Sequence, residues 1–246
     1  MLLSGEAGGV QRFVYSLGKL FQFLIPLIWI FIIERYFLSC CVGSKSAAAA
    51  TTSTTSTATS LSTAANNVYG GGGKFWIYYW VEGLIFGLVV FCGIFFLYYF
   101  WFGLDGGELG VGSVGRGVIV KKVLGFGLVD WRLFLLLGIF YSVIHSGLEE
   151  YYWRWFLFSG LRDICGVCNG IIISGLGFAA HHVILLQTFF GFNSLLCPLG
   201  SVAIFVGGIY WAWLYQRSGN IYAAWLGHGI IDAAIFSIGY IICFAG

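Results

Sequence analysis

Long apolar stretches dominate this chain of 246 residues and constrain its fold more than any other feature. A helix needs roughly 20 apolar residues to cross the hydrocarbon core of a bilayer, and about six stretches approach or exceed that length. Only 9% of the residues are charged, whereas a soluble domain carries about 25%. This composition excludes a soluble enzyme, a disordered protein and a nucleic-acid-binding protein with a basic face.

The fold class follows from the same stretches. Lipid cannot satisfy open backbone groups, and the stretches lack the alternation typical of strands. We therefore predict an all-α, polytopic membrane helix bundle of about six transmembrane helices, in an integral, multi-pass membrane protein. The expected spans run over residues 13–33, 75–102, 133–161, 165–190, 199–215 and 221–244.

The pattern divides the chain into four regions. Residues 1–42 hold the first span, and nothing before it resembles a cleavable signal peptide, so it is expected to remain as an anchor. Residues 43–74 are rich in Ser, Thr, Ala and Gly, which predicts a flexible linker. Residues 75–130 combine the second span with a glycine-rich basic connection, and residues 131–246 form the last four spans. Glu82, within the second span, is interpreted as an interfacial or paired charge.

Ionisable residues inside the last four spans are the strongest functional signal. A charge at mid-bilayer costs roughly 2.5–3.5 kcal/mol on insertion scales, so such residues usually face an internal cavity and serve a function. All four histidines of the chain belong to this set. Its members are His145, Glu149, Glu150 and Arg154 in the third expected span, His181 and His182 in the fourth, and His228 and Asp232 in the sixth.

Helical spacing sorts this set into faces. Glu150 and Arg154 are four residues apart and can pair, which favours a structural ion pair. Glu149 is rotated about 100° from Glu150 and can point elsewhere. His181 is rotated by the same angle from His182, so at most one of these two is expected to face the cavity centre. The polar patches of three helices should meet in one internal cavity.

The ionisable set also includes two pairs four residues apart on one helix. His228 shares a face with Asp232, and His145 shares one with Glu149. His145 is either a ligand, an orienting partner or a hydrogen-bonded core residue.

A glutamate with two histidines can activate water. The carboxylate takes the proton as a general base, one neutral imidazole orients the water, and a second donates to the oxyanion of a tetrahedral intermediate. Two histidines and a carboxylate are also a catalytic zinc ligand set. The sequence alone leaves both mechanisms open.

Three short motifs carry a resemblance to a known family. Residues 149–154 (EEYYWR) fit an EExxxR motif, Phe178 and His182 fit FxxxH, and His228 and Asp232 fit HxxxN/D. They occur in the order found in the CPBP family of CAAX proteases and bacteriocin-processing proteins, each on an apolar segment. The resemblance covers about residues 133–244.

The resemblance implies an intramembrane endopeptidase similar to type II CAAX prenyl endopeptidases, with a metalloendopeptidase-like site. Glu149 and His182 would activate water, while His228 and Asp232 would form the oxyanion side. The supporting residues would be Glu150, Arg154 and Phe178. The prenyl endopeptidases carry Asn where this chain has Asp232, and an ionised Asp cannot donate a hydrogen bond.

Further expectations concern cofactor, substrate and the alternative function. Hydrolysis is predicted to need no metal; if a zinc ion is present, its ligands are expected to be Glu149, His182 and His228. The substrate is expected to be a peptide or membrane-protein segment, with a prenylated C terminus among the options. The alternative is a non-catalytic membrane transporter or a bacteriocin-immunity or scaffold protein, because intramembrane Glu and His also mark proton relays.

Overall fold

A computed structural model describes residues 17–28, 74–104, 111–190 and 194–245, and this part of the chain is helical apart from short turns. The chain divides into two units, Met1–Gly71 and Gly72–Gly246. The first unit contains one described helix, Leu17–Ile28, which lies within the expected first span. The remainder of that span, and the linker predicted at 43–74 except for its last residue, lie outside the described residues.

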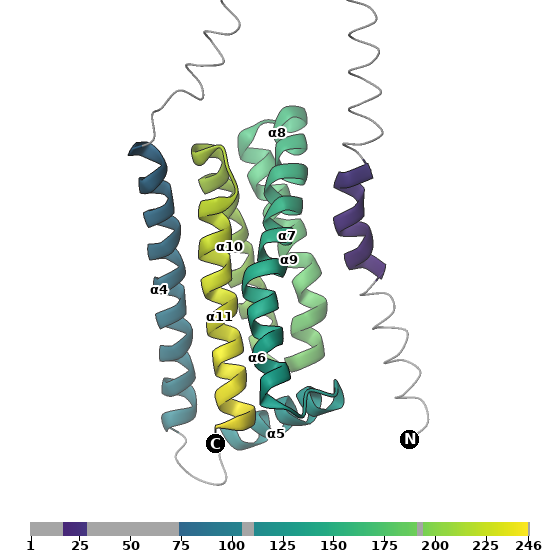
Figure 1. Cartoon of the computed structure of the whole chain (residues 1–246), viewed down its shortest axis with the longest axis vertical. Coiled ribbons are helices and arrows are strands. Elements are labelled where there is room, and N and C mark those ends of the chain that lie inside the picture. Colours follow the sequence, from purple (N-terminus) through teal and green to yellow (C-terminus); the bar gives the residue numbers. More distant parts are fainter. Residues whose placement is uncertain (1–16, 29–73, 105–110, 191–193, 246) are drawn as a thin grey trace, which may run out of the picture. The chain divides into compact units, whose positions relative to one another are not determined.

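The second unit is an all-helical bundle, drawn in Figure 1 from blue (α4) to yellow (α11). Five stretches of it are long and apolar enough to cross a membrane: Trp76–Phe100, Trp131–Cys165, Val167–Phe190, Leu196–Ser218 and Tyr222–Phe244. These match the second to sixth expected spans within a few residues. The predicted polytopic helix bundle, and with it an integral multi-pass membrane protein, is confirmed.

The elements of this unit follow one another with short connections. In chain order they are α4 (Lys74–Leu104), α5 (Val111–Gly125), α6 (Trp131–Ile139), η2 (Phe140–His145), α7 (Ser146–Glu150), η3 (Tyr151–Phe158), α8 (Ser159–Cys165), α9 (Val167–Phe190), α10 (Leu196–Ser218) and α11 (Tyr222–Phe244). The glycine-rich connection after α4 thus contains the helix α5, which the sequence pattern did not predict. Lys122 of α5 donates to the last carbonyls of α9, at Thr188 and Phe189.

The third span changes helical geometry twice. It begins after Asp130, whose carboxylate accepts a hydrogen bond from the Arg132 amide at 2.8 Å, and ends at Gly166, where φ is +84°. Two π-helical segments, η2 and η3, flank the single α-helical turn α7. Such wide turns are rare and often occur at functional sites. The turn between them carries Glu149 and Glu150.

Helix α4 packs closely along α11 through small residues. A Cβ atom on Gly83 would collide with the backbone carbonyl of Ala223, and one on Gly87 would lie 3.0 Å from the Cα of Gly227. Small residues let helix backbones approach in membranes, where dispersion contacts replace the hydrophobic effect. This contact anchors α11, the helix that carries His228 and Asp232.

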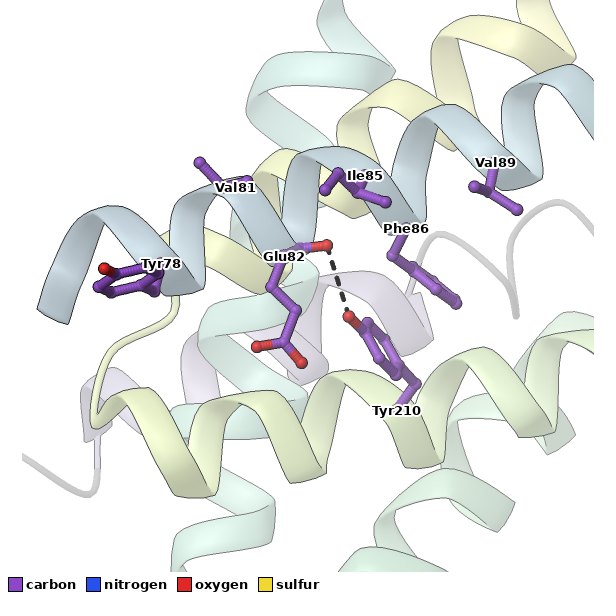
Figure 2. Close-up of a pocket in the computed structure, with 7 residues that line it drawn as sticks. All are labelled: Tyr78, Val81, Glu82, Ile85, Phe86, Val89 and Tyr210. Atoms are coloured by element: carbon purple, nitrogen blue, oxygen red, sulfur yellow. Dashed lines mark hydrogen bonds between the residues drawn. The ribbon is translucent and has the colours of Figure 1, made fainter.

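A shallow apolar pocket lies on the outside of α4 and α10 (Figure 2). Its lining includes Phe86, stacked on Tyr210 with ring centroids 3.8 Å apart, and Glu82. Arg217 of α10 donates to the Glu82 carboxylate at 2.9 Å. Glu82 is therefore paired, as the sequence predicted, and it takes no part in the polar cluster of the bundle interior.

Candidate active site

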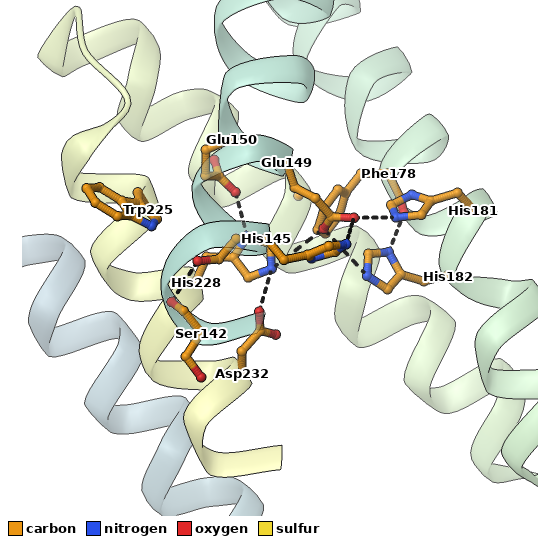
Figure 3. Close-up of polar contacts among 12 residues, drawn as sticks. Ser142, His145, Glu149, Glu150, Phe178, His181, His182, Trp225, His228 and Asp232 are labelled. Carbon is orange, nitrogen blue, oxygen red and sulfur yellow. Dashed lines mark hydrogen bonds and ion pairs between the residues drawn. The ribbon is translucent and has the colours of Figure 1, made fainter. Parts of the chain in front are cut away.

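Three spans bring the predicted site residues into one cluster, shown in Figure 3. Glu149 and Glu150 come from α7, Arg154 from η3, Phe178 and His182 from α9, and His228 and Asp232 from α11. Most of the cluster is buried: Glu149, Glu150 and Arg154 are at most 1% exposed and His228 is 4% exposed, whereas the side chains of His182 and Asp232 are each 18% exposed. The expectation that the polar patches of three helices meet is confirmed.

Glu150 links the third span to α11. Its Oε1 lies 3.0 Å from Nη1 of Arg154 and 2.8 Å from Nδ1 of His228. The Arg154 guanidinium also lies over the ring of Phe178, at 4.5 Å, and over that of Trp211, at 5.1 Å. Nη2 of Arg154 also donates a long hydrogen bond, of 3.5 Å, to the backbone oxygen of Gly208, and together these contacts hold the buried charge inside the bundle.

The carboxylate of Glu149 lies among four histidines. Its Oε1 lies 3.1 Å from Nε2 of His181 and 3.6 Å from Nε2 of His145. Its Oε2 lies 4.0 Å from Nε2 of His182 and 3.9 Å from Nε2 of His228. The two neighbouring glutamates therefore divide as predicted: Glu150 pairs with Arg154, and Glu149 faces histidines.

His181 departs from the sequence expectation. Both His181 and His182 approach Glu149, and their ring centroids are 3.9 Å apart. The 100° between neighbouring positions applies at the backbone, whereas the side-chain torsions let two imidazole rings converge several ångströms from the helix axis. The His181 ring is stacked on Trp153, with centroids 5.1 Å apart and planes at 15°.

Hydrogen bonding assigns the protons on His182. Its Nδ1 lies 2.8 Å from the backbone oxygen of Phe178, and a carbonyl oxygen can only accept, so Nδ1 carries a proton. In the neutral ring, Nε2 is then a lone pair facing Oε2 of Glu149. Two acceptors 4.0 Å apart call for a donor or a cation between them. A water within about 2.8 Å of each would bridge them.

His228 is held in a similar way. Its Nδ1 faces Glu150 and its Nε2 lies 3.9 Å from Glu149 Oε2 and 3.8 Å from Asp232 Oδ2. The ring stacks on Trp211, with centroids 4.5 Å apart. Trp153 stacks on His181 and Trp211 on His228, but no sequence signal distinguished these two tryptophans from the many other aromatic residues.

Metal-ligating atoms of Glu149, His181 and His182 all lie within 4.8 Å of one another. His182 also donates its other ring nitrogen to a backbone carbonyl, as metal-binding histidines usually do. This group differs from the zinc ligands expected from the sequence, because it contains His181 in place of His228. The donor types fit zinc, which binds imidazole nitrogen and carboxylate oxygen at about 2.0–2.2 Å.

The comparisons with known proteins agree with the motifs. Residues 131–234 match the family model described as "Type II CAAX prenyl endopeptidase Rce1-like". Neither the curated proteins nor the solved structures gave a match to the chain. The match spans all three motifs, from Glu149 to Asp232. The family resemblance predicted from those motifs is thus confirmed: residues 131–234, which carry the site, are similar to the Rce1-like family of CAAX-type proteases.

Proposed function

We propose that this protein is an intramembrane endopeptidase in which Glu149 and His182 activate a water molecule. The observation that carries the proposal is the meeting of three groups in a buried space: Glu149 Oε2 with the Nε2 atoms of His182 and His228, at 4.0 and 3.9 Å. A carboxylate and imidazole lone pair can together orient and deprotonate a water placed between them. The family match supports a peptide as the substrate.

The reaction would proceed in two steps. Glu149 takes a proton from the water as its oxygen attacks the peptide carbonyl carbon, forming a tetrahedral oxyanion. Collapse of this intermediate breaks the C–N bond, and Glu149 returns the proton to the departing amine. The carboxylate thus ends in the state in which it began.

The oxyanion would be stabilised from α11. A doubly protonated His228 presents an Nε2–H toward the same space, and the carboxylates of Glu150 and Asp232 at its two nitrogens complement the charge. Glu150, Arg154 and Phe178 would hold His228 and the helix carrying Glu149, without touching the substrate. We further propose that hydrolysis requires no metal, zinc at the clustered Glu and His residues being the alternative.

The test is cleavage of a peptide library by the purified full chain and by its Glu149→Gln variant. The library should contain matched peptides with and without a C-terminal prenyl group. The control is Glu82→Gln, which removes another carboxylate of the same bundle outside the cluster. We expect Glu149→Gln to lose cleavage by at least about 10³-fold while Glu82→Gln retains it. Wild-type activity in folded Glu149→Gln would refute the assignment.

The same assay also tests whether hydrolysis requires a metal ion. Activity that survives prolonged chelation supports the metal-free mechanism. Loss on chelation that zinc restores and magnesium does not would replace it with zinc catalysis.

A second function is favoured by the continuity of the polar cluster. Contacts run from His145 through Glu149 to His228 and Asp232, and such a chain can relay protons in a transporter. Proton-coupled flux in proteoliposomes that His228→Ala abolishes, with no peptide cleavage by the wild type, would favour a transporter. Absence of both cleavage and flux would favour an immunity or scaffold role.

A further inference from the structure

We propose that His181, together with His145, is a positioning residue that holds one oxygen of Glu149 so that the other faces the reacting water. Neither histidine belongs to the three motifs that carry the family resemblance. The kinetic part of this inference rests on the proposed function, whereas the hydrogen bond itself does not. The proposal assigns different tasks to the two oxygens of a single carboxylate.

The four histidines divide between these two oxygens. His145 and His181, which lie outside the motifs, approach Oε1 at 3.6 and 3.1 Å. His182 and His228, which belong to the motifs, face Oε2 at 4.0 and 3.9 Å. Only the shortest of these contacts is a direct hydrogen bond. Oε1 is therefore bound to protein, while Oε2 borders a gap that a water can fill.

The surroundings of His181 orient it as a donor. Its Nδ1 is buried and has no hydrogen-bond partner among the residues that the structure describes. A neutral ring that carries its proton on Nε2 can donate it to Glu149, whereas a proton on Nδ1 would be unpaired and would leave two acceptors 3.1 Å apart. The stacking on Trp153 fixes the plane of the ring and hence the direction of that N–H.

The hydrogen bond from His181 matters because the carboxylate group of a glutamate rotates easily about its last torsion. The last torsion of a glutamate is broad and roughly two-fold, so nothing internal keeps Oε2 toward the gap. Catalysis depends on the base being held close to its productive position. A hydrogen bond to a charged group is strong enough that its loss corresponds to about a 10- to 150-fold effect on rate.

Three substitutions of His181 distinguish the effect of its hydrogen bond from the effect of its aromatic ring. His181→Phe keeps an aromatic ring over Trp153 and removes the donor. His181→Gln places an amide N–H near the position of Nε2, whereas His181→Asn places it near that of Nδ1. The control Ile184→Phe introduces the same side chain at a residue of α9 that is 49% exposed.

The kinetic readout is the separate measurement of kcat and KM on a peptide that the wild type cleaves. We expect His181→Phe and His181→Asn to lower kcat by about 10- to 150-fold with KM within about 2-fold. His181→Gln should recover most of the loss, and Ile184→Phe should behave as wild type. A merely structural role for His181 would not be rescued by glutamine in preference to asparagine.

The second readout needs no catalysis. Infrared spectra of protein with ¹³C-labelled glutamate, taken as wild type minus Glu149→Gln, isolate the carboxylate stretch of Glu149. We expect this band to shift in His181→Phe and His181→Asn and to return in His181→Gln. If His181→Phe fails to fold, the band and the kcat of His181→Gln are compared with those of His181→Asn instead.

The outcomes distinguish the two proposals. A shifted band in a protein that cleaves no peptide supports the hydrogen bond and refutes the endopeptidase. Loss of cleavage in Glu149→Gln, with wild-type kcat in both His181→Phe and His181→Asn, leaves the endopeptidase standing and overturns the positioning role. An unshifted band in these two variants overturns it as well.

Discussion

Removing the buried positive charge of Arg154 should destabilise the bundle far more than removing an exposed charge. The substitution Arg154→Met keeps an unbranched, apolar stem and deletes the guanidinium. It leaves Glu150, which is 0% exposed, with His228 as its remaining ion-pair partner among the described residues. Oε2 of Glu150 has no hydrogen-bond partner there, so it offers no compensation.

The size of the effect follows from this burial. Breaking a buried ion pair by removing one partner costs about 3–5 kcal/mol, because a charge is left uncompensated. Each kcal/mol lowers the melting temperature of a 150–250-residue domain by about 2–4 °C. Arg154→Met should therefore melt about 6–20 °C below the wild type. The lost contacts of the guanidinium with the rings of Phe178 and Trp211 act in the same direction.

The assay is thermal unfolding of the full chain in one detergent, followed by size-exclusion of the protein that stays monodisperse. The double variant Glu150→Gln with Arg154→Met removes both charges and keeps an amide oxygen that His228 can reach. It should melt at least halfway back toward the wild type. The control Glu82→Gln breaks the pair with Arg217, whose side chains are 29% and 41% exposed. Such a pair contributes up to about 1 kcal/mol, so the control should lose less than about 4 °C.

Two results would contradict the reasoning. One is an Arg154→Met variant that melts within about 2 °C of the wild type, since the charge of Glu150 would then be compensated in some other way. The other is a double variant that is less stable than Arg154→Met alone. That order would mean that Glu150 acts independently of the ion pair.

Two further predictions concern the packing and the oxyanion side. Gly83→Leu should destabilise the bundle by at least about 2 kcal/mol in the same melting assay, because the Cβ of the new side chain meets the backbone of α11. The control Gly93→Ala should change the melting temperature little, because a Cβ at Gly93 has nothing within 4 Å. Equal melting temperatures of the two variants would contradict the close contact between α4 and α11. Asp232→Asn should retain peptide cleavage within about 10-fold, because its amide can donate to the oxyanion and so replace the charge that Asp232 contributes beside His228; a loss beyond about 100-fold would show that this charge cannot be replaced.

The spans were predictable because hydropathy is a local property. The fifth expected span, 199–215, lies inside α10, and the third, 133–161, lies within Trp131–Cys165. The Glu150–Arg154 pair was predictable for the same reason, since four residues along one helix bring two side chains together. The cost of placing charge in lipid predicted that the polar patches of the helices would meet. It did not predict which atoms would be in contact.

The contacts between helices were not predictable in the same way. His228 and Glu150 are 78 residues apart in sequence, and no spacing rule relates them. The convergence of His181 on Glu149 depends on side-chain torsions and on Trp153 beneath the ring. The two π-helical segments were not predictable from residue spacing, because spacing rules assume 3.6 residues per turn throughout. Their sequences, FYSVIH and YYWRWFLF, show no breaker that would mark them.

The π-helical segments make the site sensitive to the length of the third span. A wide turn holds one more residue than a regular α-helical turn, so η2 could not be rewound as an α-helix at unchanged length without carrying that extra residue into the rotation. Everything after η2 would then turn by about 100° relative to α6. Glu149 would leave its partners on α9 and α11 without any change to its neighbours in sequence. Homologous chains that keep this site should therefore either keep the π-helical winding or be one residue shorter where the segment winds regularly.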